Sequence, residues 1–433
     1  MDDKTVEYKI ADEWNLHVSP SDCLLNTPIN ISVHGKYPGT PFTLKATKTC
    51  NNIIFSSEAS FILGENGTTN LSESVPFNGT YAEANSMGLL WSMRRVKYIS
   101  GSTADTFYDL SPIKTTLTLE VNNVCVSEQT IIQHHLSEDI KMVPIKESGF
   151  IGTAFVPQNK TNFASIIFLD GSQRFQSIKE AALLASNGYC TLSVSYLKSH
   201  KHTPSLSHIP VETIGNAIEW LNTRDFIVNK KIGIVGKSRG SELALHAASI
   251  YHDIEAIISI AGSGISYHGL KDNLTMNLPP AWTYRGKPLP YAALYAPKLS
   301  GYALYKQLSQ NKSVSFRDWY EELIADKKVL DLATIPVENI KGSLLFISGD
   351  DDLMWDSAKL SGISIQRLNR FKHPWPFKHD IYSRAGHRIE LPHTYHNYNE
   401  SPSPFLYGGN QYSDLKASHN AWNKLVLFLN EVL

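Results

Sequence analysis

One serine in this sequence, flanked by two glycines, has the clearest potential for chemistry. Gly236-Lys237-Ser238-Arg239-Gly240 matches the pattern G-x-S-x-G, preceded by the β-branched run KKIGIV and followed by the alanine- and leucine-rich run SELALHAAS. A strand that turns sharply into a helix needs glycines at these two positions, because side chains there would collide with neighbouring backbone. We therefore predict that Ser238 projects from a sheet edge, where its hydroxyl can attack a carbonyl carbon.

A serine hydroxyl becomes a strong nucleophile only when a base removes its proton. In this strand-turn-helix context we expect a carboxylate and then a histidine further along the chain. The apolar run SLLFISG is followed by Asp350, Asp351 and Asp352, of which one can orient an imidazole while the others would be solvated loop charges. The last predicted strand, HDIYSRAGH, ends in His387 after two small residues, which let the loop swing its imidazole toward the serine.

The attack would also need hydrogen-bond donors for the oxyanion that forms on the carbonyl oxygen. The start of a helix presents unsatisfied N–H groups and the positive end of the helix dipole. The backbone N–H of Arg239 is therefore the first donor that we predict.

The remaining histidines compete weakly with His387. His393 and His396 are spaced like a pair of metal ligands, but no third ligand stands at a recognisable spacing beside them, so we expect no metal. Three more lie in a polar loop and are His200, His202 and His208.

The pattern of apolar residues differs between two parts of the chain, and these parts contain the elements that must position the candidate residues. Up to about residue 140, short alternating apolar runs such as 30–35, 41–47 and 115–121 predict an antiparallel, immunoglobulin-like β-sandwich over residues 1–140. Strands then alternate with amphipathic helices, which predicts an α/β-hydrolase domain with a mostly parallel sheet over residues 141–433. Its expected strands are 163–171, 189–196, 230–238, 254–264 and 343–352, and its expected helices are 178–188, 210–224, 241–252 and 421–433. The stretch 265–340 fits neither period, and we predict a cap over the carboxyl edge of the sheet.

Composition and charge limit the classes of partner. The 433 residues carry a formal net charge of −1, which provides no general attraction to nucleic acid or to an anionic membrane. The start MDDKTVEYK lacks the features of a signal peptide and no run is apolar enough to span a bilayer, so we expect a soluble cytoplasmic protein. Four cysteines without CxxC spacing indicate reduced interior thiols. The oligomeric state, monomer or homodimer, stays open.

Further motifs resemble the family of type I acyl-CoA thioesterases and bile acid-CoA:amino acid N-acyltransferases over nearly the whole chain. The first 140 residues contain VSP at 18–20 and MGLLWSM at 87–93, which look like the family's opening strand and its MGLLW-x-M segment. GKSRGSELAL at 236–245 is similar to its nucleophile element. WTYRGKPLPY resembles a segment of its bacterial members. The later matches are GDDDLMW at 349–355, AGHRIELPHTY at 385–395, YGG at 407–409 and AW at 421–422.

The resemblance implies that Asp352 is the acid among the three aspartates and that acyl-CoA is the substrate, with no cofactor. The family usually carries several glycines after the third strand, whereas here Gly171 is followed by SQRF. At this departure from the family pattern, we expect the second oxyanion donor to be the backbone N–H of Ser172 or Gln173. Basic residues near the site are the candidates for contacts with the CoA phosphates, and these are Arg174, Lys237, Arg239 and Arg285.

Several activities remain compatible with these residues. A serine ester is better matched to attack by water than the thioester that a cysteine would form, so we favour hydrolysis over transfer to glycine or taurine. The same residues also fit a carboxylesterase or peptidase of this fold, and a binding protein that has lost catalysis.

Overall fold

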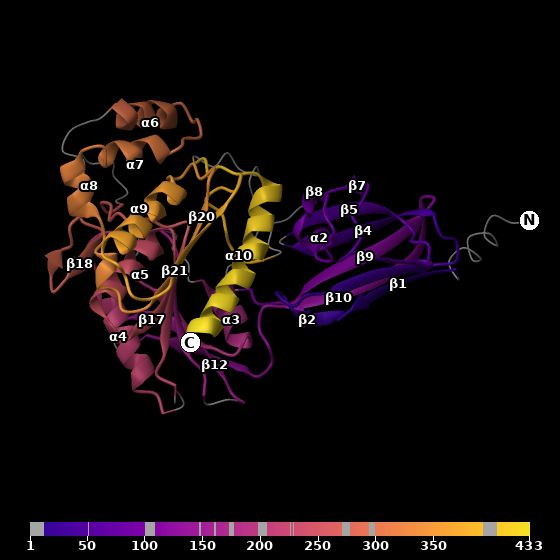
Figure 1. Cartoon of the computed structure of the whole chain (residues 1–433), viewed down its shortest axis with the longest axis horizontal. Helices are drawn as coiled ribbons and strands as arrows, with labels where there is room; N and C mark the ends of the chain where they lie inside the picture. The colour runs from indigo at the N-terminus through magenta and orange to yellow at the C-terminus, as the bar shows by residue number, and fades with distance from the viewer. Residues whose placement is uncertain are drawn as a thin grey trace, which may run out of the picture. The chain divides into compact units, whose positions relative to one another are not determined.

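The computed structural model describes residues 13–50, 52–99, 109–146, 149–159, 162–172, 177–197, 206–225, 227, 229–270, 278–293, 299–392 and 405–433. The chain divides into two compact units (Figure 1). Unit 1 comprises Met1–Ser137 and Leu391–Tyr395, and unit 2 comprises Glu138–Glu390 and His396–Leu433. The division lies close to the boundary predicted at residue 140.

Unit 1 contains two β-sheets. The smaller has the order β1 (Trp14–Ser19), β3 (Asn30–Gly35), β6 (Thr68–Asn70). The larger has the order β2 (Asp22–Leu24), β10 (Val124–His134), β9 (Ile113–Val121), β4 (Pro41–Cys50), β5 (Ile53–Ile62), β7 (Asn78–Gly79), and β8 (Arg94–Tyr98) also pairs with β5. A single helical turn, α2 (Gly88–Trp91), is the helix of this unit within the described residues.

Alternating side chains of both sheets form the core of unit 1. Along β4, buried Phe42, Leu44 and Ala46 alternate with more accessible residues, as the period-two pattern predicts. The ring of Trp14 in β1 lies 5.9 Å from that of Phe42, so apolar side chains of the two sheets meet. The antiparallel prediction holds for most pairs, but β2 and β10 are parallel.

Unit 2 is built on one eight-stranded sheet. Its order is β11 (Ile140–Ile145), β12 (Ile151–Pro157), β14 (Cys190–Ser195), β13 (Ser165–Leu169), β16 (Ile232–Lys237), β17 (Ile254–Ile260), β20 (Ser343–Gly349), β21 (Phe377–Tyr382). From β14 to β21 all pairs are parallel, while β12 pairs antiparallel with both β11 and β14. Every residue of β13 and β20 is buried, which is typical of strands covered on both faces. This is the predicted α/β-hydrolase sheet, although β11 and β12 had no counterpart in the prediction.

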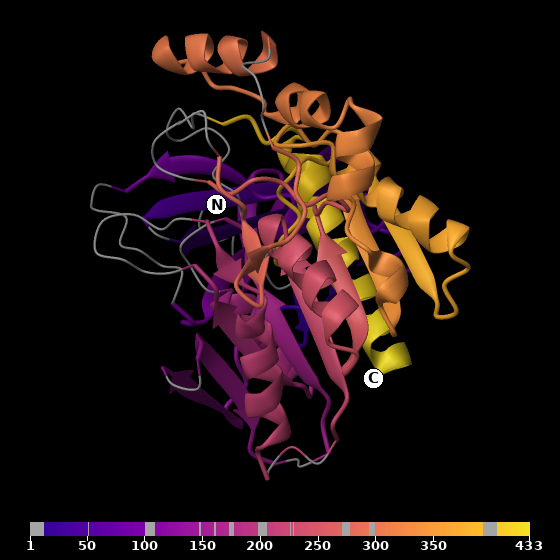
Figure 2. The same cartoon turned by 90° about the vertical axis from the view of Figure 1, so that its left-hand side faces the viewer.

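Helices cover both faces of this sheet. In Figure 1, α3 (Ile178–Ser186) and α10 (Gln411–Val432) lie on one face, and α4 (Glu212–Asn222), α5 (Arg239–Ile250) and α9 (Ser357–Arg370) lie on the other. Figure 2 looks onto the second face, with α10 behind the sheet. The carboxyl ends of the parallel strands share one edge, so the segments that follow β13, β16, β20 and β21 meet there. None of the described helices has the length and apolar content that crossing a bilayer requires.

The stretch predicted as a cap contains short elements that its sequence did not reveal. They are β18 (Trp282–Tyr284), β19 (Lys287–Pro288), α6 (Leu299–Ser309), α7 (Arg317–Leu323), α8 (Lys327–Ala333) and the 3-10 turn η1 (Val337–Asn339), and β18 pairs with β15 (Ile209–Pro210). In Figures 1 and 2, α6 and α7 lie beyond the end of the sheet at which β20 ends. Tyr267 and Tyr320 of this stretch form one buried cluster with Trp355, which follows β20.

The four cysteines are free, but they are not all interior as expected. Cys190 is buried and Cys125 is exposed. Burial raises the pKa of the Cys190 thiol to about 12, so this thiol stays protonated and apolar at neutral pH.

The buried strand β20, which lies between β17 and the edge strand β21, allows a test of the packing. Replacing the fully buried Phe346 by Ala removes a ring from the core and is expected to cost about 3–5 kcal/mol. Phe371, which is 49% exposed, is the matched control, and Phe371→Ala should cost less than about 1 kcal/mol. Thermal unfolding followed by circular dichroism measures both, and equal losses would contradict the described core.

Buried His246 on α5 predicts loss of stability in acid. Burial lowers the pKa of His246 to about 3, with a further contribution from the positive charge of Arg239. The unfolded chain binds a proton near pH 6.5 and the folded chain does not, so stability is fully present above that pH and falls as the pH drops toward 3. In denaturant titrations between pH 7 and 4, His246→Leu should flatten this fall, whereas His252→Leu, at an exposed histidine just after α5, should keep it.

Candidate active site

The turn between β16 and α5 holds Ser238 in a strained conformation. Its φ is 52° and its ψ is −122°, a combination that residues other than glycine rarely adopt. A Cβ at Gly236 would lie 2.5 Å from the carbonyl oxygen of Gly240, and a Cβ at Gly240 would lie 2.1 Å from that of Asp170. The two glycines are therefore required by close backbone contacts, as predicted from the sequence.

Three side chains from separate strand ends form a continuous hydrogen-bonded chain. Nε2 of His387 lies 2.9 Å from Oγ of Ser238, and Nδ1 lies 2.8 Å from Oδ2 of Asp352. Asp352 is 1% exposed and His387 is 6% exposed. With the proton on Nδ1 shared with the carboxylate, Nε2 is free to accept the serine proton. The structure thus brings together all three residues that the sequence analysis selected.

Backbone groups fix the carboxylate of Asp352. Its Oδ1 accepts hydrogen bonds from the N–H groups of Met354 and Trp355 at 3.0 and 3.2 Å. The two preceding aspartates are exposed, and each accepts a bond from a loop N–H instead: Asp350 from Arg384 and Asp351 from Gly409. Only Asp352 of the three contacts His387, in agreement with the choice implied by the family resemblance.

The segment Tyr407-Gly408-Gly409 joins the aspartate loop to the histidine loop. The N–H of His387 donates to the carbonyl of Tyr407 at 2.8 Å, and Asp352 forms a β-bridge with Gly408. Gly408 has a φ of +72°, and a Cβ there would lie 1.7 Å from the carbonyl oxygen of Asp351. Both its backbone conformation and this close contact require a glycine at position 408, which explains the first glycine of the YGG motif.

The segment after β13 lies against Ser238. A Cβ added to Gly171 would lie 3.1 Å from Cβ and 3.6 Å from Oγ of Ser238. Tyr196, which the sequence analysis did not single out, donates its hydroxyl to the carbonyls of Asp170 and Gly171 at 2.7 and 2.5 Å. Ser172 follows directly and is exposed. Ser172 and Gln173 were the two candidates for the second oxyanion donor, and Gln173 lies outside the described residues. Arg174, His393 and His396 also lie outside them.

The side chain of Arg239 is buried inside unit 2. Its guanidinium forms an ion pair with Glu242 at 2.8 Å and donates to the carbonyls of Tyr267 and His268 at 3.1 and 2.8 Å. Glu242 also accepts from the indole N–H of Trp282, and burial raises its pKa to about 7 against the opposing charge of Arg239. Arg239 therefore ties the first turn of α5 to the predicted cap stretch and is not available to a phosphate, while its backbone N–H remains at the start of the helix.

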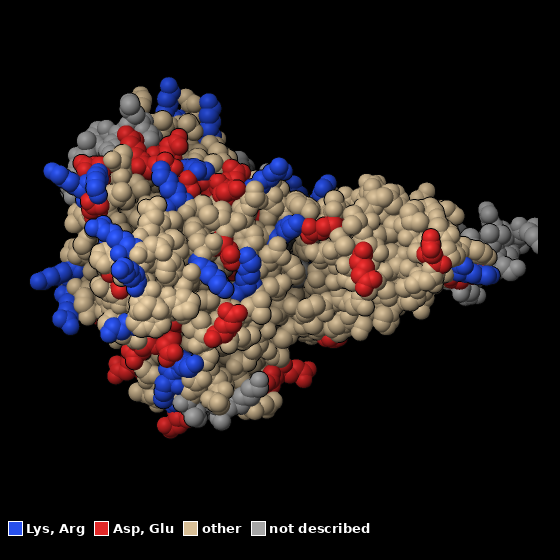
Figure 3. Space-filling view, in the orientation of Figure 1, with Lys and Arg blue, Asp and Glu red and all other residues tan. Residues whose placement is uncertain are grey.

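Of the other predicted phosphate contacts, Lys237 and Arg285 lie within the described residues. Lys237 forms an ion pair with Glu390, both side chains being largely buried, so its charge is matched within the protein. Arg285 is exposed on the turn between β18 and β19, where its backbone N–H donates to Glu212 at the start of α4. Figure 3 shows Lys and Arg interspersed with Asp and Glu on the face that it displays, without a broad area of one sign for a polyanion.

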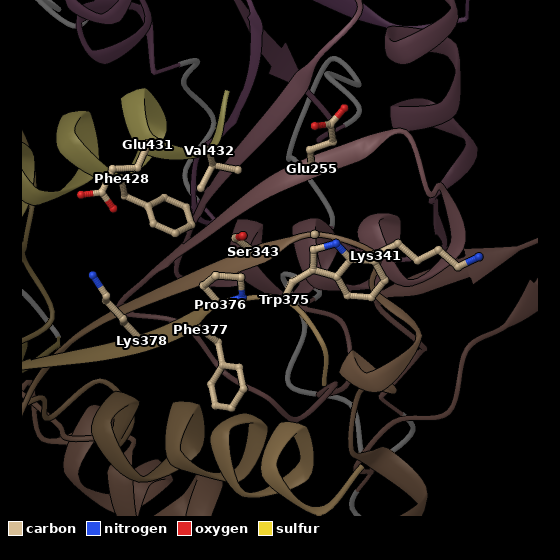
Figure 4. A pocket seen from close by; sticks show the side chains of 11 residues that line it. Glu255, Lys341, Ser343, Trp375, Pro376, Phe377, Lys378, Phe428, Glu431 and Val432 are labelled. Atoms are coloured by element: carbon tan, nitrogen blue, oxygen red, sulfur yellow. The ribbon is translucent and has the colours of Figure 1, made fainter. Parts of the chain in front are cut away.

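A cavity of about 520 Å³ is unrelated to these residues. Glu255, Ser343 and Phe377, at or near the starts of β17, β20 and β21, line it together with Val432 of α10 (Figure 4). It thus lies at the amino ends of the strands, whereas Ser238, Asp352 and His387 follow carboxyl ends. Across the described ranges, no group of three or more His, Cys, Asp or Glu is arranged to hold a metal ion.

Family models match both parts of the chain. The model described as "BAAT / Acyl-CoA thioester hydrolase C terminal" matches residues 209–433, and "Acyl-CoA thioester hydrolase/BAAT N-terminal region" matches residues 26–147. The chain belongs to the BAAT/acyl-CoA thioester hydrolase family. Membership in this family agrees with the α/β-hydrolase sheet and with the preceding β-domain.

Named members of the BAAT/acyl-CoA thioester hydrolase family align over nearly the full length. Acyl-coenzyme A amino acid N-acyltransferase 1 of Mus musculus is 25% identical, with 96% of this chain and 97% of the relative covered. Acyl-coenzyme A thioesterase 6 of Mus musculus is also 25% identical, with 94% and 93% covered. Among solved structures, Pyrococcus horikoshii acylaminoacyl peptidase matches with a TM-score of 0.43 and 12% identity over 94% of this chain and 60% of that one.

The bond between His387 and Asp352 predicts a strong effect of Asp352→Asn. The N–H groups of Met354 and Trp355 would keep the amide oxygen at the position of Oδ1, so the amide NH2 group would face His387 and donate to Nδ1. The proton would then stay on Nε2, which could no longer accept the serine proton, so the reactivity of Ser238 should fall by about 1,000-fold or more. The rate of labelling of Ser238 by a fluorophosphonate probe measures this. The carboxylate of Asp351 accepts from the N–H of Gly409 and does not contact His387, so Asp351→Asn should label within about threefold of the wild type. Equal rates for the two variants would contradict the geometry.

Proposed function

We propose that this chain hydrolyses acyl-CoA thioesters, with Ser238 as nucleophile, His387 as general base and acid, and Asp352 as the residue that orients the histidine. The observation that carries the proposal is the unbroken hydrogen-bonded chain from Oγ of Ser238 to the carboxylate of Asp352. Membership in the family and the names of relatives, which include acyl-coenzyme A thioesterases, support the substrate class.

In the first half-reaction, Oγ of Ser238 attacks the thioester carbonyl carbon and its proton passes to Nε2 of His387. The oxyanion receives hydrogen bonds from the backbone N–H of Arg239 and from the segment after Gly171, with Ser172 as the second donor. Collapse of the tetrahedral adduct breaks the C–S bond, and His387 returns the proton to the departing CoA sulfur. An acyl group remains on the serine as an oxygen ester.

In the second half-reaction, water replaces CoA. His387 takes a proton from the water, the resulting hydroxide attacks the ester carbonyl, and the C–O bond to Ser238 breaks as the histidine returns the proton to Oγ. The products are a free carboxylic acid and CoA, and the enzyme is regenerated without a cofactor.

Transfer to an amino acid is the second candidate, because relatives of similar identity include an acyl-coenzyme A amino acid N-acyltransferase. The two reactions share the acyl-enzyme and differ in the group that attacks it. A serine ester is a weaker acyl donor toward amines than a cysteine thioester would be, which favours water as the acceptor here. We also propose that the protein is cytoplasmic, whether the acyl acceptor is water or an amino acid.

The experiment is a thiol-release assay over short, medium and long acyl-CoAs, each with and without glycine or taurine. We expect release of CoA and free acid without dependence on the amine, and loss of about 10⁴-fold or more in Ser238→Ala. The control is Ser249→Ala, which should retain activity. Ser249 lies in α5 and donates its hydroxyl to the carbonyl of His246.

Three outcomes separate the competing activities. CoA release that rises with added amine, together with an acyl-amide product, would establish the transferase. Faster turnover of oxygen esters than of any acyl-CoA would favour a carboxylesterase. If Ser238→Ala left acyl-CoA turnover unchanged, the proposed nucleophile would be wrong.

A further inference from the structure

Lys237 directly precedes the nucleophile, and its ammonium group lies among acidic side chains from other parts of unit 2. We propose that Lys237 is a positioning residue, which holds the serine turn, the histidine loop and the segment after β13 in the relative positions that the reaction requires. The inference rests on the proposed role of Ser238 and extends it to a residue that contacts no reacting atom.

Strand register places the first acidic partner. β13 and β16 are parallel neighbours, with Leu169 opposite Gly236. Asp170 and Lys237 directly follow this pair, and the positive charge of Lys237 lowers the pKa of Asp170 against the effect of burial. Asp170 in turn accepts a hydrogen bond from the N–H of Gly171 at 2.8 Å, and Gly171 is the residue packed against Ser238.

The second partner comes from the histidine loop. The ammonium group of Lys237 donates to Oε1 of Glu390, which follows His387 by three residues. The backbone N–H of Glu390 donates to the hydroxyl of Ser418 on α10 at 3.0 Å, so this residue is anchored on its other side as well. Through this bond Lys237, the residue before the proposed nucleophile, is connected to the loop that carries the proposed base.

The third partner is Glu180, which lies in the first turn of α3. Burial raises the pKa of Glu180 to about 7, and the positive charge of Lys237 opposes the shift while Asp170 and Glu390 add to it. Burial likewise raises the pKa of Asp170, again against the effect of Lys237. The positive charge of Lys237 thus favours the ionised form of these carboxylates, against the burial that favours the protonated form.

Loss of this cation should disturb the site without removing any group that reacts. The carboxylates would repel one another or take up protons, and Asp170 and Glu390 would move the segments to which they are joined. Displacements of about 1 Å at a reacting centre reduce rates by up to about 100-fold. Because Lys237 contacts no substrate atom in the proposed mechanism, the effect should fall on kcat and leave KM nearly unchanged.

The test compares Lys237→Met with Lys237→Arg in the full-length protein, through the fluorophosphonate labelling rate of Ser238 and through kcat and KM for an acyl-CoA. We expect Lys237→Met to lower the labelling rate and kcat by between about tenfold and 100-fold, with KM within about threefold of the wild type. Lys237→Arg keeps the cation and should label within about threefold of the wild type.

Two further variants guard against a loss of folding. Lys237→Met combined with Glu180→Gln removes one of the carboxylates left without a cation, and it should melt close to the wild type while still labelling slowly. Arg367→Met breaks the partly buried ion pair with Glu338 and is the matched control, since it should lower the melting temperature without changing the labelling rate.

The inference is overturned if folded Lys237→Met, alone or with Glu180→Gln, labels within twofold of the wild type, or if Lys237→Arg loses as much as Lys237→Met. Labelling reports on Ser238 whatever the substrate is. A wild type that is labelled at Ser238 but does not hydrolyse acyl-CoA would therefore refute the proposed substrate class, while the labelling rates of the variants would still decide the role of Lys237.

Discussion

The two hydrogen bonds of the His387 imidazole are the constraint on which the rest of unit 2 depends. They span 2.9 and 2.8 Å and join three segments that follow different strands. Hydrogen bonds weaken steeply outside a narrow range of distance and angle, so the three segments must be held to within a few tenths of an ångström. The parallel register of β16, β17, β20 and β21 provides the coarse alignment, because it brings their carboxyl ends to one edge.

The fine alignment comes from backbone contacts that exclude side chains. At Gly236, Gly240 and Gly408 an added Cβ would lie within 2.5 Å of a backbone atom of another residue in the site. These contacts let the serine turn approach the end of β13, and let the aspartate loop approach the segment of Tyr407. Because two packed backbones cannot yield as a flexible side chain does, the positions of Ser238 and Asp352 are set by the chain itself and not by the substrate.

Local pattern was enough to predict the parts of the site that depend on neighbouring residues. The strand, glycine turn and helix around Ser238, the order of the triad residues and most of the parallel strands could be read in this way. Asp352 was separated from Asp350 and Asp351 only through the family resemblance, because all three follow one strand and their bonds to distant N–H groups are not visible locally. The partners of Lys237 could not be predicted, since Asp170, Glu180 and Glu390 come from segments that only the folded sheet brings together. The sequence analysis gave Lys237 only as a candidate contact for the CoA phosphates, although a lysine directly after the apolar run IGIVG could have pointed to a carboxylate partner within the protein.

The predicted cap is anchored to α5, which follows Ser238, and to the loop that carries Asp352. Arg239 and Glu242 of α5 bind the backbone of Tyr267, and Trp355, two residues before the start of α9, packs against Tyr267 and Tyr320. Trp355 also donates its indole N–H to the carbonyl of Ala261 and lies with its ring edge-on to His387. Tyr320 belongs to α7, so this helix takes part in the anchoring, while α6 lies further from the sheet (Figures 1 and 2). Residues of α6 can therefore change without disturbing the contacts of Tyr267, Tyr320 and Trp355.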